Sequence, residues 1–235
     1  MKKIIYSLML CLASTLFIGC EDETSQDQSR ITYYATLELK EDATLFWDLG
    51  QPYVDPGYIA ELQGEDITDQ VIVEGKVDVN TPGIYSLTYK ITNADGFSVT
   101  ESRTVMVADP TASPVSSGYW TTSATSYRNY NGITQYGSAY PVVMLQMAPG
   151  KFYISDFLGG WYDQRAAYGP TYAMEGEFQL NEDNTITPIK SSVAGWGDSM
   201  DEMIDGKYDP ATGAITWCIV YGGASHMEFY VTLTR

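Results

Sequence analysis

A segment in the last third of the chain carries residue types that proteins use to bind sugars. Residues 159–172 combine tryptophan and tyrosines with an aspartate and an arginine, and glycine or proline stands near both ends. Aromatic faces stack on the C–H groups of sugar rings, while polar side chains bind the hydroxyls. The segment is long for a hairpin loop, and long loops on a rigid scaffold often carry binding residues. The predicted ligand-binding residues are Trp161, Tyr162, Asp163, Arg165 and Tyr168.

A structural role is the alternative for the same segment. Trp161 and Tyr162 could close one end of a β domain, and Asp163 could pair with Arg165. A second aromatic group either adds to a binding surface or packs on a neighbouring domain. It consists of Tyr119, Trp120, Tyr127, Tyr130, Tyr136 and Tyr140. Because 20 of the 31 aromatic residues lie within residues 115–235, any ligand site is expected there.

Other groups give weaker indications of chemistry. Residues 195–205 are acidic and could supply oxygen ligands to calcium, but their spacing is not that of an EF-hand loop. Solvated surface is the preferred interpretation, so no metal and no cofactor is predicted. The acidic side chains are Asp198, Asp201, Glu202 and Asp205. The single histidine, His226, alternates onto the polar face of the last predicted strand, which favours a structural role over that of a catalytic base.

The sequence also lacks the motifs of the common enzyme classes. With 30 acidic residues, a plausible carboxylate pair for glycoside hydrolysis would arise by chance. No phosphate-binding loop, dinucleotide fingerprint or nucleophile elbow is present in the sequence. We therefore expect a protein that is not an enzyme.

The charge balance excludes one class of partner. Lys and Arg number 13 against 30 Asp and Glu, which gives a formal net charge of −17. A nucleic-acid-binding surface needs a basic footprint, so no nucleic-acid partner is predicted. Attachment to anionic lipid through basic residues is excluded on the same ground.

The first residues have the pattern of a secretion signal. Lys2 and Lys3 precede an apolar stretch, residues 4–18, that is too short to span a membrane comfortably. The ending Phe17-Ile18-Gly19-Cys20 resembles the signal of bacterial lipoproteins, with Phe17 where leucine is usual. The resemblance implies a signal peptide of residues 1–19, cleavage before Cys20 and a lipid on the Cys20 thiol.

Residues 20–30 are predicted to form an acidic flexible tether, because they are polar and show no apolar period. The cluster Glu21-Asp22-Glu23 resembles the surface-export signal of Bacteroidetes lipoproteins. These resemblances imply an outer-membrane location, with the lipid anchor on Cys20 and the protein facing the cell exterior. Cys218, in an apolar run, is predicted to be a small buried hydrophobe, so no disulfide is expected in the exported part.

A period of two predicts an immunoglobulin-like (Ig-like) β-sandwich over residues 31–109. Between Tyr85 and Ile91 apolar and polar residues alternate, and the turn residues 93–96 lead into a second strand. Glu101 and Arg103 interrupt the apolar face of that second strand, which predicts a bulge or a sheet edge. Roughly seven short strands in this region suit a sandwich.

Motifs in the same region closely resemble the bacterial group-3-type Ig-like domain of surface proteins. They are Tyr53–Tyr58, Gly64–Thr68, Val77–Tyr85 and Asn93–Gly96. The resemblance implies a spacer or presentation module without chemistry of its own. Residues 110–114, rich in Pro, Ser and Thr, are predicted to link it to a second domain.

Residues 115–235 are predicted to form an antiparallel β-barrel or a curved β-sandwich, lipocalin-like at most. Alternation at residues 174–180 and 227–233 predicts strands, and one short helical turn is expected near residues 199–203. The segments Tyr153–Asp163 and Tyr168-Gly169 resemble a family of Bacteroides surface lipoproteins of unknown function. Many such lipoproteins are encoded with outer-membrane glycan-uptake systems.

These observations predict an all-β, surface-anchored lipoprotein in which an Ig-like spacer presents a carbohydrate-binding domain. Two alternatives remain open at this stage. The aromatic residues could form an interface for another outer-membrane protein, or the second domain could carry a small apolar ligand.

Overall fold

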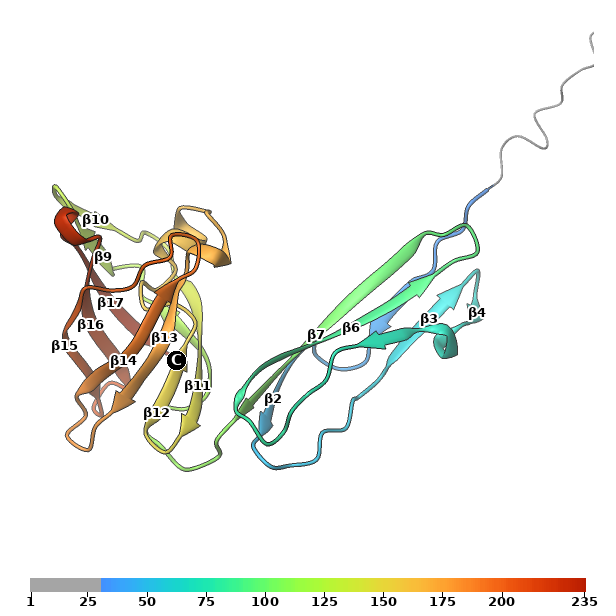
Figure 1. Cartoon of the computed structure of the whole chain (residues 1–235), viewed down its shortest axis with the longest axis horizontal. Coiled ribbons are helices and arrows are strands. Elements are labelled where there is room, and N and C mark those ends of the chain that lie inside the picture. Colours follow the sequence, from blue (N-terminus) through green and yellow to red (C-terminus); the bar gives the residue numbers. More distant parts are fainter. Residues whose placement is uncertain (1–30) are drawn as a thin grey trace, which may run out of the picture.

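Residues 31–109 fold into two facing β-sheets, and residues 115–235 into one large curved sheet (Figure 1). The structure is a computed structural model that describes residues 31–235. The predicted signal peptide, the tether and Cys20 lie outside the described residues. The predicted all-β fold class, an Ig-like domain followed by a curved antiparallel β domain, is confirmed.

The Ig-like domain buries apolar residues between its two sheets. One sheet has the order β1-β3-β4 and the other β2-β7-β6-β5, with β2 parallel to β7. The strands are β1 (Thr36–Leu39), β2 (Thr44–Asp48), β3 (Tyr58–Leu62), β4 (Glu65–Asp66), β5 (Ile72–Glu74), β6 (Gly83–Thr92) and β7 (Ser98–Ala108); η3 (Thr68–Gln70) is a short 3-10 turn. Leu87, Tyr89 and Ile91 of β6 are buried as their alternation predicts. They pack against Leu37 and Ala60 of the opposite sheet.

Arg103 is the exception to the apolar interior of this domain. It lies on the same face of β7 as Val105 and Val107, and its side chain is completely buried. The predicted bulge is wrong, because β7 pairs with β6 without a register shift from Ser98 to Val107. The alternative prediction of a sheet edge holds for the first half of β7, since β2 pairs only from Thr104 onward.

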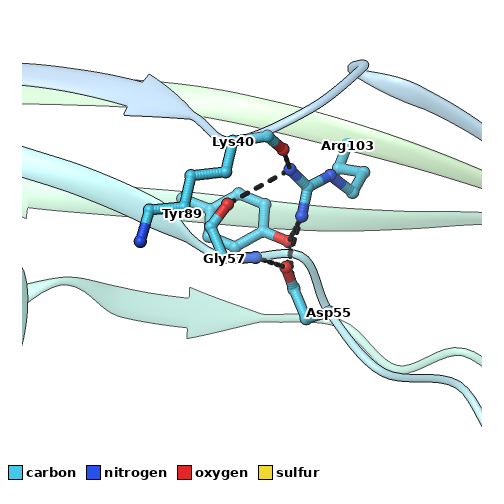
Figure 2. A network of polar contacts seen from close by, with 5 residues as sticks. All are labelled: Lys40, Asp55, Gly57, Tyr89 and Arg103. Atoms are coloured by element: carbon cyan, nitrogen blue, oxygen red, sulfur yellow. Dashed lines mark hydrogen bonds and ion pairs between the residues drawn. The ribbon is translucent and has the colours of Figure 1, made fainter.

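The guanidinium of Arg103 ties three segments together (Figure 2). It forms an ion pair with Asp55, donates to the carbonyls of Lys40 and Gly57, and lies over the ring of Tyr89. Asp55 also accepts from the Tyr89 hydroxyl and, at 2.7 Å, from the Gly57 backbone N–H. A buried charge is tolerated only when it is paired and hydrogen-bonded, and these contacts satisfy the two terminal nitrogens of Arg103, while its buried Nε has no hydrogen-bond partner.

The C-terminal domain is a ten-stranded antiparallel sheet that curls back toward itself. Its main order is β14-β13-β12-β11-β8-β17, and β16 and β15 continue beyond β17. The β9–β10 hairpin joins the sheet through β9, which pairs with β17 along the same edge as β8. The strands are β8 (Gly118–Thr122), β9 (Tyr127–Asn129), β10 (Ile133–Gln135), β11 (Tyr140–Ala148), β12 (Lys151–Ile154), β13 (Met174–Leu180), β14 (Ile186–Val193), β15 (Glu202–Asp209), β16 (Ala214–Tyr221) and β17 (Met227–Thr234). Between β14 and β15 an isolated bridge joins Thr185 to Lys207, and no regular ladder closes the sheet.

Large side chains occupy the interior of the curl. Phe152, Phe178 and Trp217 are buried there, with Phe152 and Phe178 stacked at a centroid distance of 5.4 Å. These side chains fill the interior of the curled sheet, which is the place where a carrier would bind a small apolar ligand. The helical turn expected near residues 199–203 is wrong: β15 starts at Glu202, and the chain turns earlier, at residues 194–197.

A small apolar contact and the linker join the two domains. Leu145 of β11 is fully buried against Met106 and Ala108 on the outer face of β7. Phe46 of the Ig-like domain packs edge-to-face on Tyr119, with ring centroids 5.8 Å apart. Linker residues bind to the second domain, because the side chain of buried Gln146 donates to the Thr111 carbonyl at 2.8 Å.

We expect Asp55→Ala to lower the free energy of unfolding by about 3–5 kcal/mol, because it leaves the buried guanidinium of Arg103 without its counter-ion. Urea unfolding checks this, with exposed Asp48→Ala as the control. Adding Arg103→Met should recover part of the loss, since no unpaired charge then remains. A loss below about 1 kcal/mol for Asp55→Ala would contradict the role given to the ion pair.

Candidate functional site

The carboxylate of Asp156 organises the segment that carries the predicted ligand residues. Asp156 is buried where β12 ends. One carboxylate oxygen accepts from the N–H groups of Leu158 (2.8 Å) and Met174 (2.9 Å), and the other accepts from Gly160 (2.8 Å). Because Met174 begins β13, this one side chain ties the start of the excursion to its end. Burial raises the pKa of Asp156 to about 6, although the three N–H donors oppose the shift.

Trp161 follows this turn and points into the protein core. Gly160 adopts a left-handed conformation (φ 85°), and an added Cβ there would lie 2.8 Å from the Cβ of Tyr140. Trp161 is 3% exposed and begins η4 (Trp161–Arg165), a single π-helical turn. Its ring lies under two guanidinium groups, with centroid distances of 4.2 Å to Arg165 and 4.7 Å to Arg128.

This placement corrects the predicted role of Trp161, while Arg165 stays exposed. Trp161 has no free face for a sugar, because it packs on Tyr136 and Phe229 in the core. Arg165 donates to the carbonyl of Tyr136 at 3.1 Å and stacks on Trp161. The alternative prediction that Trp161 closes one end of the domain therefore describes its place correctly. The expected pairing of Asp163 with Arg165 is not among the ion pairs of residues 31–235.

Tyr162 and Tyr168 belong to a cluster of aromatic rings at the end of the domain. We call the distal aromatic cluster the four residues Tyr162, Tyr168, Tyr172 and Trp196. Trp196 packs edge-to-face on Tyr162 (4.7 Å between centroids) and lies 6.3 Å from Tyr168 with the rings at 82°. Tyr168 is 57% exposed and Trp196 42% exposed, so both side chains are partly accessible to solvent. Burial raises the pKa of the Tyr162 hydroxyl, which lies at the base of the cluster.

Two carboxylates hold the loop that carries Trp196. Asp198 accepts from the hydroxyl of buried Tyr221 at 2.8 Å, and Asp201 accepts from the N–H of Gly223 at 2.8 Å. Gly223 begins η6 (Gly223–Ser225), so the loop is tied to the end of β16. Figure 1 shows the segment between β12 and β13 and the loop after β14 at the same end of the domain, opposite the linker. This arrangement gives the cluster a rigid support.

The sequence prediction missed Trp196 and Tyr172 as site residues. The signal for Trp196 was present, since the run Gly195-Trp196-Gly197 places a large aromatic side chain in a loop outside any alternating strand. Tyr172 lies in η5 (Pro170–Tyr172), and its ring packs on Trp196 at a centroid distance of 4.8 Å. Only the fold brings these two segments together.

Asp163 lies apart from the distal aromatic cluster. With Gln164 it lines a hollow of about 320 Å³, together with Tyr119, Tyr153 and Glu175, and no residue of the cluster lines this hollow. Burial raises the pKa of the Asp163 carboxyl. The five predicted ligand residues are thus separated: Trp161 lies in the core, Tyr162 and Tyr168 in the distal aromatic cluster, Asp163 in this hollow, and Arg165 is exposed over Trp161.

The second aromatic group does not form one exposed face. Trp120 and Tyr136 are buried, and the Tyr136 hydroxyl donates to the Leu158 carbonyl at 2.5 Å. Tyr127 stacks on Tyr230 of β17, with centroids 4.5 Å apart. Tyr119 packs on the Ig-like domain, as the alternative prediction expected for the group.

Among residues 31–235, no group of three or more His, Cys, Asp or Glu side chains is arranged to hold a metal ion. His226 lies 3.6 Å from Glu228 on β17. Cys218 is free and buried, as predicted, and burial raises the pKa of its thiol to about 11.

The two halves of the chain match two protein-family models. Residues 37–107 match the model described as "Bacterial surface protein, Ig-like domain", and residues 109–235 match a model for a C-terminal domain. The fold and these matches define a two-domain bacterial surface protein with an N-terminal Ig-like domain.

A solved structure identifies the family. The crystal structure of the lipoprotein BT2262 from Bacteroides thetaiotaomicron is 54% identical to this chain, with a TM-score of 0.75. The match covers 86% of this chain and 100% of that chain. This chain therefore belongs to the same family of Bacteroides lipoproteins, and the family resemblance inferred from the sequence is confirmed.

Other comparisons add little to this identification. A structure from Clostridium perfringens ZmpB, which contains CBM51-2 in complex with GlcNAc and INT domains, is 17% identical over 51% of this chain and 31% of that chain. Its TM-score is 0.28. A search of the curated proteins finds no match. Within residues 31–235, none of the helices has the length and apolar character needed to cross a membrane.

The buried Asp156 carboxyl predicts a pH dependence. Its folded pKa of about 6 lies above the ordinary value of 3.8, so its contribution to stability is complete below pH 3.8 and is lost as pH rises through 6. Asp156→Asn cannot titrate and leaves one buried N–H without an acceptor. We expect the stability advantage of wild type over Asp156→Asn to be larger at pH 4.5 than at pH 7.5, by about 2 kcal/mol.

Urea unfolding of both proteins at the two pH values measures this difference. The exposed Asp205→Asn serves as the control and should follow the wild type at both pH values. An advantage of wild type over Asp156→Asn that is equal at pH 4.5 and pH 7.5 would exclude Asp156 as the titrating group.

Proposed function

We propose that this chain is a non-enzymatic lipoprotein of the outer-membrane surface that binds carbohydrate through the distal aromatic cluster. One observation carries the proposal: Tyr168 and Trp196, which are 57% and 42% exposed, lie together on a supported end of the molecule with ring centroids 6.3 Å apart. Exposed aromatic residues are usually scattered singly, so two neighbouring rings on fixed loops favour a binding surface. Their chemistry suits the apolar faces of sugar rings.

Polar groups beside the rings suit the sugar hydroxyls. Asp198 and Asp201 are exposed and already oriented by Tyr221 and Gly223. A carboxylate held in place by one hydrogen bond keeps further acceptor sites for a ligand. Because less ordering is then required on binding, preorganised groups contribute more to affinity.

The position of the C-terminal domain supports a role in presenting a ligand site away from the membrane. The chain enters the Ig-like domain at the end far from the C-terminal domain (Figure 1). With a lipid on Cys20, the Ig-like domain would act as a spacer that holds the C-terminal domain away from the membrane. Such an arrangement suits an accessory protein that captures a polysaccharide for an outer-membrane uptake system.

We expect Trp196→Ala and Tyr168→Ala each to weaken glycan binding at least about tenfold, which corresponds to about 1.4 kcal/mol. Affinity electrophoresis of the mature protein through gels that contain a panel of polysaccharides measures the effect. Tyr130→Ala is the matched control, because Tyr130 is an exposed tyrosine, 39% accessible, on the β9–β10 hairpin. Lack of retardation by every polysaccharide, or equal retardation of all variants, would refute carbohydrate binding at this cluster.

Membrane attachment through Cys20 has its own test. We expect Cys20→Ser to move the protein from the membrane fraction to the soluble fraction, because the thiol that carries the lipid is lost. Fractionation of cells, with mass spectrometry of the mature N-terminus, measures this, and Cys218→Ser is the control. Retention of Cys20→Ser in the membrane would show that attachment does not depend on the lipid.

A second candidate function is docking on another outer-membrane protein. It is favoured by the β9–β10 hairpin, where edge strand β10 exposes Ile133 to 70%. Pull-down from detergent-solubilised membranes distinguishes the two functions. A stoichiometric partner lost in Ile133→Ser, together with no retardation by glycans, would favour docking.

A further inference from the structure

Four exposed apolar side chains lie at the end of the Ig-like domain where the described chain begins. Ile31 is 72% exposed, Tyr33 49%, Tyr34 62% and Phe97 48%. The ring of Tyr34 packs against Phe97 with centroids 5.3 Å apart, and the amide of Asn93 donates to the Tyr33 carbonyl at 2.7 Å. Two segments 60 residues apart in the sequence thus build one surface, which we call the tip patch (Ile31, Tyr33, Tyr34 and Phe97).

The tip patch lies close, along the chain, to the predicted lipid. Residues 21–30 are all that separate Ile31 from Cys20, and a fully extended chain of that length spans at most about 40 Å. An anchored molecule therefore keeps the patch within that distance of the bilayer. A short link raises the effective concentration of the second contact to the millimolar range, so even a weak contact is populated.

The chemistry of the patch suits lipid better than it suits water. Tyrosine is favoured at the membrane–water interface, where its hydroxyl stays hydrated and its ring is buried, and phenylalanine is typical of apolar faces that bury into that boundary. The C-terminal domain lies at the opposite end of the Ig-like domain (Figure 1), so it leaves the patch open. Because the link to the lipid on Cys20 is short, the bilayer is the partner that the chain itself brings closest to the patch.

We propose that the tip patch inserts into the interfacial region of the bilayer and holds the Ig-like domain upright on the membrane. The proposal rests on the lipid anchor at Cys20 and is independent of glycan binding. Three exposed carboxylates, on Glu61, Glu65 and Asp95, lie at the same end of the domain. They repel an anionic surface, so insertion is expected to be weaker in anionic than in zwitterionic bilayers.

A nitroxide on Phe97→Cys tests this in the full lipidated protein, reconstituted into phosphatidylcholine vesicles. Cys218 is buried with a raised thiol pKa, so the introduced cysteine is the one labelled. Power saturation compares accessibility to oxygen, which concentrates in lipid, with accessibility to an aqueous nickel chelate. Insertion predicts a higher oxygen-to-nickel ratio at position 97 in vesicles than in solution, and a smaller rise when anionic lipid is added.

Ile133→Cys is the matched control, since Ile133 is also an exposed apolar residue but lies on the C-terminal domain. Tyr34→Ser in the position-97 protein should return the ratio toward that of the control. The proposal would be overturned if the oxygen-to-nickel ratio at position 97 in vesicles equalled the low ratio at position 133. Mass spectrometry first shows that the protein used carries the lipid. Glycan retardation measured on the same variants stays unchanged in either case, which separates this test from that of the proposed function.

Discussion

The conformation of the exposed end of the C-terminal domain depends on one buried carboxylate, which accepts hydrogen bonds from three backbone N–H groups. The chain leaves the sheet after β12 and returns at β13, and Asp156 accepts from Leu158, Gly160 and Met174 on the two sides of that excursion. Without this acceptor, buried donors at both ends of the segment would lack partners, which proteins rarely tolerate. The carbonyls of the same turn are bound as well, Phe157 by the Trp217 indole and Leu158 by the Tyr136 hydroxyl.

This turn, with its backbone groups hydrogen-bonded, explains how one segment contributes side chains to both the core and the surface. With the turn held, Trp161 is directed into the interior and Tyr162 to the base of the distal aromatic cluster. Tyr168 and Trp196 can then remain partly exposed, because the rings behind them are already packed. A comparable arrangement supports the Ig-like domain, where Arg103 binds Asp55 and two carbonyls from separate segments. In each domain one buried polar side chain fixes a segment without regular secondary structure, which apolar packing alone would not position.

The alternation of residues predicted the strands more reliably than the roles of individual side chains. Leu87, Tyr89 and Ile91 are buried as their period of two requires. Arg103 occupies an inward-facing position in the same pattern. Its burial is possible because Asp55, which is 48 residues away in the sequence, lies beside it in the fold. The interruption that suggested a bulge is therefore a buried ion pair. Such a partner cannot be recognised from local sequence, because the pairing depends on how the two sheets face each other.

By itself, the sequence determined the all-β class, the Ig-like module and the concentration of aromatic residues in the second domain. These properties follow from short-range periodicity and composition, which do not require knowledge of distant contacts. The tertiary structure decided which aromatic residues are available. It buried Trp161 beneath two arginines and brought Trp196 from a separate loop against Tyr162. The physical reason is that exposure depends on which distant segments cover a ring, and those segments meet only when the sheet has curled.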